Sequence, residues 1–164
     1  MSAGSEYTCA LRSNGTLWCW GANWDGWLGQ GNWNDTNTPL QVGTTTTWAT
    51  VSTGGYHTCA TRTDGTLWCW GANWSHQAGQ PGTTGDQTTP TQVGTNNTWA
   101  TVSAGEQHTC ARRTDDTIWC FGLNAHGQTG QGDTTPRAGL TQVPGGTGKA
   151  LSVGYAANHI MIIS

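Results

Sequence analysis

Short stretches of alternating apolar and polar residues, punctuated by Gly, Asn and Pro, recur along the chain at a period of about 50 residues. The segment 7–21 returns as 57–71 and again as 108–122. Alternation and β-branched and aromatic content predict four short strands in each repeat. In the first repeat these strands are 7–12, 16–20, roughly 40–42 and 48–52. Four strands at this period are typical of one blade of a β-propeller.

The repeats divide the chain into three full units and a remnant. The expected units are approximately residues 1–50, 51–101 and 102–150, with a partial fourth unit at 151–164. The sequence therefore predicts an all-β chain of four-stranded blades, about three and a bit blades long. All 164 residues belong to a single propeller domain or half-propeller.

Six cysteines flank the predicted hairpin turns in three pairs. A two-residue turn at Asn14-Gly15 would place Cys9 opposite Trp20, whereas a three-residue turn places Cys9 opposite Cys19. We favour the second register, because it matches small residues to large ones in all three units and brings each pair within disulfide reach. The predicted disulfides are Cys9–Cys19, Cys59–Cys69 and Cys110–Cys120. Free thiols and a metal site are the alternatives, and zinc spacing is missing.

Composition and charge narrow the classes of partner. Charged residues are only 9% of the chain and the net charge is −3, so no basic patch favours nucleic acid. No apolar run approaches the ~20 residues that a membrane-spanning helix needs. No signal peptide is visible in the sequence. The predicted disulfides nevertheless indicate an oxidising compartment, and hence an extracellular location or a cell or virion surface.

Catalytic and metal chemistry are not indicated. The sequence holds no nucleophile motif and no phosphate-binding loop, so we expect neither an enzyme nor a cofactor. Three histidines, His57, His108 and His159, occupy the same position of successive repeats. Repetition at one position favours a structural hydrogen bond from the imidazole over a metal site.

The loop after each hairpin differs between repeats and is rich in tryptophan. The expected ligand or partner contacts are Trp24, Trp27, Trp33 and Trp74. Tryptophan offers a large rigid contact area, which suits a sugar or a protein partner. The alternative is that these side chains pack against a neighbouring blade or fill a seam between two chains.

The repeats resemble those of the regulator of chromosome condensation family. The resemblance rests on the pattern from Gly54 to Gly71 and on the turns 26–29, 77–79 and 127–130, and it covers essentially the whole chain. The cysteines resemble those of secreted or surface repeats of bacterial and phage-like proteins. The resemblance implies a propeller of about seven blades and a role as an interaction platform.

The chain has fewer than half the repeats of such a propeller. We therefore expect a homodimeric ring in which the C-terminal segment of each chain completes the first blade of the other. A fragment of a longer polypeptide and a longer head-to-tail assembly are the alternatives. The expected function is a non-enzymatic scaffold for a protein partner. A lectin-like propeller that binds glycans through the loop tryptophans is one alternative, and a viral or appendage structural component is another.

Overall fold

The computed structural model describes residues 1–152 and 161–163, and its regular structure is entirely β. The first sheet contains β1 (Ser2–Ala3), β2 (Tyr7–Leu11), β3 (Leu17–Gly21) and β4 (Thr36–Gln41). The second contains β5 (Trp48–Thr53), β6 (His57–Arg62), β7 (Leu67–Gly71) and β8 (Gln87–Gln92). The third contains β9 (Trp99–Ala104), β10 (His108–Arg113), β11 (Thr117–Gly122) and β12 (Arg137–Thr147). A short pair, β13 (Ala150–Ser152) and β14 (Met161–Ile163), follows.

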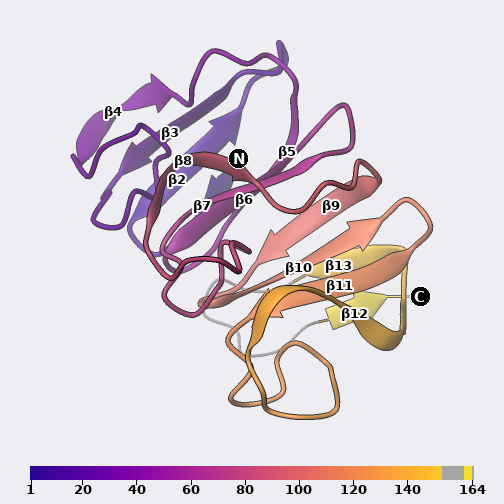
Figure 1. Cartoon of the computed structure of the whole chain (residues 1–164). Helices are drawn as coiled ribbons and strands as arrows, with labels where there is room; N and C mark the ends of the chain where they lie inside the picture. Colours follow the sequence, from indigo (N-terminus) through magenta and orange to yellow (C-terminus); the bar gives the residue numbers. More distant parts are fainter. Residues whose placement is uncertain (153–160, 164) are drawn as a thin grey trace.

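The three four-stranded antiparallel sheets lie side by side in chain order (Figure 1). The first strands of consecutive sheets contact one another, β1 with β5 and β5 with β9, and β13 then lies against β9. This is the arrangement of propeller blades around an axis. The residues that the structure describes form an arc of blades and no closed ring.

The predicted hairpin register is confirmed. Cys9 lies opposite Cys19, and Leu11 lies opposite Leu17, as the three-residue turn requires. The second and third sheets repeat this register, and disulfides join the cysteines of each hairpin in the predicted pairs. All six cysteines are fully buried, so each bridge lies inside the stack of blades.

Three strand predictions differ from the structure. The segment 48–52, expected to close the first repeat, is part of β5 and pairs with β6, so it opens the second sheet. The strand expected at about 40–42 begins earlier, at Thr36. The sequence pattern does not reveal this start, because the outer strand is mostly exposed and shows no apolar alternation. The first sheet also has its own first strand, β1 on β2, contrary to the expectation that another chain must supply it.

The connections fall on two opposite rims, which carry different kinds of loop. The long-loop rim consists of residues 4–6, 22–35, 54–56, 72–86, 105–107 and 123–136. The turn rim consists of residues 12–16, 42–47, 63–66, 93–98, 114–116 and 148–149. All the predicted tryptophan contacts lie on the long-loop rim.

Candidate binding site

A buried asparagine organises each loop of the long-loop rim. Asn23 is fully buried; its Oδ1 accepts from the backbone N–H of Leu28 at 2.9 Å, and its Nδ2 donates to the carbonyl of Asn32 at 2.9 Å. Asn73 and Asn124 make equivalent bonds in the second and third loops. The loops are therefore fixed from within, and their exposed side chains project from a rigid base.

The four predicted tryptophans divide into two groups. Trp24, Trp33 and Trp74 have 61%, 59% and 44% of their surface exposed. Trp27, which the sequence analysis also expects as a ligand or partner contact, is only 1% exposed. Its ring fills the junction between the first two sheets, which is the packing role that the sequence left as the alternative.

Four aromatic rings form a continuous row across the loops of the first two sheets. Successive ring centroids are 5.7 Å apart from Trp24 to Trp27, 6.0 Å from Trp27 to Tyr56, and 5.4 Å from Tyr56 to Trp74. We call these four residues the aromatic row; its two ends are exposed and Trp33 lies outside it. Tyr56 was missed from the sequence, although it is a repeat-specific residue beside a repeated histidine.

The backbone of Trp27 also ties the two sheets together. Its carbonyl accepts hydrogen bonds from Thr58 Oγ1 at 2.9 Å and from Trp70 Nε1 at 2.8 Å. Between the second and third sheets, Thr109 Oγ1 donates in the same way to the carbonyl of Gln77 at 2.8 Å. The aromatic row thus rests on a repeated contact between blades.

The repeated histidines support this contact. His57 is buried and its Nε2 lies 2.6 Å from Thr109 Oγ1, a side-chain partner rather than the expected backbone group. Burial, with a smaller contribution from His108, lowers the pKa of His57 to about 3. His57 is therefore neutral at physiological pH and acts in packing. His159 lies outside the described residues.

Two carboxylates from neighbouring loops lie beside the aromatic row. Asp25 Oδ2 accepts from Trp27 Nε1 at 3.0 Å, and the backbone N–H of Gly31 donates to the carbonyl of Thr88 at 2.8 Å, which draws the first loop onto the second. Partial burial raises the pKa of Asp25. Partial burial and the charge of Asp25 also raise the pKa of Asp86. These two groups are close enough to repel each other.

Charge is distributed unequally between the rims. The long-loop rim carries the carboxylates Glu6, Asp25, Asp35, Asp86, Glu106 and Asp133, and one cation, Arg137, stands at the adjoining end of β12. The turn rim carries the carboxylates Asp64, Asp115 and Asp116 and the cations Arg12 and Lys149. The adjoining ends of β6 and β10 add Arg62, Arg112 and Arg113. The rim that bears the aromatic row is therefore the acidic one.

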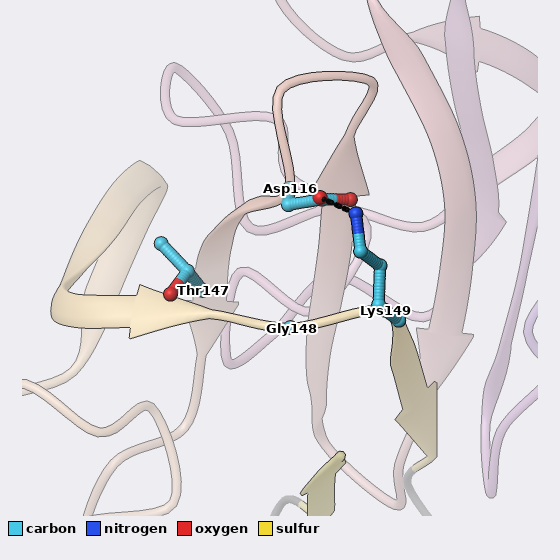
Figure 2. Close-up of a pocket in the computed structure, with 4 residues that line it drawn as sticks. All are labelled: Asp116, Thr147, Gly148 and Lys149. Atoms are coloured by element: carbon cyan, nitrogen blue, oxygen red, sulfur yellow. Dashed lines mark hydrogen bonds and ion pairs between the residues drawn. The ribbon is translucent and has the colours of Figure 1, made fainter. Parts of the chain in front are cut away.

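The turn rim holds a small hollow of about 200 Å³ at the end of the third sheet, lined by Asp116, Thr147, Gly148 and Lys149 (Figure 2). Asp116 occupies the left-handed position, φ 67°, that glycine holds in the other two turns. In the turn of the second sheet the equivalent residue is Gly65, where an added Cβ would lie 2.1 Å from the carbonyl oxygen of Asn97. Lys149 and Arg112 form ion pairs with Asp116, so the carboxylate that lines the hollow is already paired with cations of the chain.

The described residues form neither a metal site nor a membrane-spanning helix. Within residues 1–152 and 161–163, no group of three or more His, Cys, Asp or Glu side chains is placed to hold a metal ion. Over the same residues, no helix is long and apolar enough to cross a membrane. The aromatic row with its two carboxylates is therefore the candidate site.

Two family profiles of known proteins match the repeats of this chain. A sequence profile described as "Regulator of chromosome condensation (RCC1) repeat" matches residues 14–61 and 64–112, and a second profile with that description matches residues 1–26 and 99–128. No curated protein sequence matches the chain.

Solved structures show the same fold. Prp20p from Saccharomyces cerevisiae, described with its binding to Gsp1p and histones, is 18% identical over 93% of this chain and 40% of its own, with a TM-score of 0.82. Yeast RCC1 (Prp20) bound to Kap60 is 17% identical over 94% of this chain and 39% of its own, with a TM-score of 0.85. Human WBSCR16 is 16% identical over 93% and 54%, with a TM-score of 0.56. The chain spans about two fifths of the Prp20 structures and matches part of their propeller.

Proposed function

The chain belongs to the regulator of chromosome condensation (RCC1) repeat family, and from this premise we propose that it is a non-enzymatic scaffold that binds a protein partner. The observation that carries the proposal is the exposure of Trp24, Trp33 and Trp74 on one rim of a rigid framework. Exposed tryptophans on a fixed base are typical of the centres of protein interfaces. The yeast relative is itself described as bound by proteins, which supports a role of this kind.

The test is capture of partners by the immobilised chain and by a Trp24→Ala/Trp74→Ala variant. A partner set that depends on the rim is retained by the unaltered chain and lost by the variant. Retention of the same set by both would refute the use of this rim. Inertness of the chain towards a broad panel of hydrolase substrates is the expected result of the non-enzymatic part of the proposal.

Carbohydrate binding is the second candidate, and the exposed indole rings favour it. Indole faces stack on sugar rings, and the amide-rich loops around Trp24 and Trp33 supply hydrogen-bond groups. A glycan screen with Trp24→Ala, Trp33→Ala and Trp74→Ala variants tests it. Flat binding across all glycans would remove this candidate.

A second copy of the chain is the proposed completion of the propeller. In the second sheet, Thr58 and Trp70 are buried against the loop of the first sheet. The equivalent Thr8 and Trp20 of the first sheet are only half-buried, because no sheet precedes it in the described chain. A ring of two chains and about seven blades would cover that face. A native mass of 17.3 kDa in non-reducing solution, rather than about twice that, would refute the dimer.

The location that we propose is extracellular, or on the surface of a cell or virion. The three disulfides indicate an oxidising environment. They also support assignment to the cysteine-containing repeats of bacterial and phage-like proteins, and a structural part of a virion or appendage is compatible with that setting. Labelling of intact producing cells or particles with an antibody against the chain tests the location; labelling only after lysis would contradict it.

A further inference from the structure

The carboxylates of the chain differ in whether an arginine or lysine of the chain acts on them. The carboxylates of Asp64, Asp115, Asp116 and Asp133 each interact with an arginine or lysine of this chain, and the pKa of each is lowered. For Asp25 and Asp86 the pKa is instead raised, in both cases mainly by partial burial, and the one charge that acts on Asp86 is the negative charge of Asp25. Between residues 13 and 111 the chain contains no lysine and one arginine, Arg62. No arginine or lysine of the chain contributes to the pKa shift of Asp25 or Asp86, so a cation that pairs with them would come from outside the chain.

The cations of the chain are already engaged elsewhere. The guanidinium carbon of Arg12 lies 4.0 Å from the ring centroid of Trp18 on the turn rim, and Arg62 lies 3.7 Å from Trp68. The third sheet repeats this stack with Arg113. One guanidinium in each sheet thus lies over one or two indole rings, at the end of the sheet opposite the aromatic row.

The aromatic row offers the same kind of ring face without a cation. Trp24 and Trp74 are exposed at its two ends, and Asp25 lies between Trp24 and Trp27 in the loop. An indole face attracts a cation through its quadrupole, and a neighbouring carboxylate adds a direct charge interaction. The row and the carboxylates therefore complement one ligand group, a guanidinium or ammonium.

We propose that the aromatic row, with Asp25 and Asp86 beside it, binds an extended basic segment of a partner protein, whose arginine or lysine side chains stack on Trp24 and Trp74. This inference rests on the proposed scaffold function and names the chemistry of its partner. The row spans roughly five residues of an extended chain. A segment with two cationic side chains a few residues apart can therefore reach both exposed indoles. An acidic segment is repelled by the same two carboxylates.

The test uses fluorescence anisotropy of the whole chain with labelled twelve-residue peptides of repeated Arg-Gly-Ser, Lys-Gly-Ser or Glu-Gly-Ser units. The arginine peptide should bind with an affinity that falls as salt rises, and the glutamate peptide should not bind. Trp24→Ala/Trp74→Ala should weaken binding of the arginine peptide by about tenfold or more. Asp25→Asn/Asp86→Asn should weaken it similarly and flatten the salt dependence; asparagine at position 25 keeps an acceptor for Trp27 Nε1.

Matched controls separate the row from the general acidity of the rim. Trp33→Ala removes an equally exposed indole outside the row, and Glu6→Gln removes an exposed carboxylate of the same rim. Both should bind the arginine peptide like the unaltered chain, and near-ultraviolet circular dichroism should show that every variant is folded. Equal losses in the controls and in the row variants, or no binding of either basic peptide, would overturn the inference. Binding of neutral oligosaccharides that Trp24→Ala/Trp74→Ala abolishes, with no binding of either basic peptide, would overturn it in favour of a glycan site. Partner capture that depends on the rim but not on Asp25 and Asp86 would overturn it while leaving the scaffold function standing.

Discussion

Removal of one disulfide tests whether cross-links or packing hold the blades together. The informative variant is Cys59→Ala/Cys69→Ala in the second sheet, which has a neighbouring sheet on each face. Both cysteines are fully buried and join adjacent strands of one hairpin. The variant removes one cross-link and two sulfur atoms, whereas reduction of the unaltered chain breaks all three cross-links and keeps every sulfur atom. Comparison of the variant and the unaltered chain when both are reduced isolates the effect of the lost sulfur atoms.

The magnitude follows from the length of the closed loop. The two cysteines are 10 residues apart, as in the other two hairpins. The loop-closure estimate for such a loop is about 2.7 kcal/mol for each bridge. All three together then contribute about 8 kcal/mol, which is comparable with the whole stability of a typical domain, about 5–15 kcal/mol. For a chain of this size, loss of one bridge lowers Tm by roughly 6–12 °C.

The assay is thermal and urea unfolding, followed by circular dichroism, with and without a phosphine reductant. The double variant should lose about 3 kcal/mol or slightly more, and full reduction should leave the chain unfolded or close to unfolding near 37 °C. The same pair of substitutions at Cys9 and Cys19 is the matched control, since its loop has equal length. If the reduced chain keeps a Tm within about 3 °C of the oxidised chain, packing alone holds the blades and the reasoning fails.

Three further perturbations test the packing between sheets. The pKa of His57 is lowered from 6.5 to about 3, so below pH 6.5 the unfolded chain takes up a proton that the folded chain excludes. The free energy of unfolding should therefore be unaffected by His57 above pH 6.5 and fall by up to about 1.4 kcal/mol per pH unit towards pH 3. The urea midpoints of His57→Gln should lack that part of the pH dependence. Trp27→Ala should cost about 3–5 kcal/mol in urea unfolding, whereas Trp24→Ala should cost less than about 0.5 kcal/mol. Trp70→Phe should cost about 1–2 kcal/mol, because the donor to the Trp27 carbonyl is lost while a ring remains, as Phe121 shows in the third sheet; no measurable change in unfolding would contradict the role of that bond.

The hairpins could be predicted because local sequence determines them. A three-residue turn and the alternation around it place Cys9 opposite Cys19, and the same pattern occurs three times. The boundary between sheets could not be predicted in this way. Self-similarity gives the period of a repeat but not where one sheet ends, so the strand 48–52 was assigned to the wrong sheet. β5 is joined to β6 by the short connection 54–56, and the boundary between the sheets lies instead at the connection 42–47.

The candidate site was predictable in part. The repeat-specific tryptophans indicated the correct loops, but residue type alone does not distinguish Trp24, which is exposed, from Trp27, which is buried. The difference lies in the position within the loop. Trp27 stands where the other repeats have Gln77 and Gln128, which are also buried, so burial belongs to the position and not to the indole. Tyr56 and the approach of Asp86 depend on the neighbouring sheet and leave no signal in either loop alone.

The repeats also show which features of the site the fold itself requires. The carbonyl of Gln77 accepts from the next sheet as the carbonyl of Trp27 does, so this contact between blades needs a backbone position and not an indole. The third sheet folds with Ala125 at the position of Trp74 and with Gln107 at the position of Tyr56. Packing of blades therefore accounts for the buried Trp27 but does not require the exposed Trp24 and Trp74. Their concentration beside two carboxylates that no cation of the chain neutralises is better explained by something that binds there.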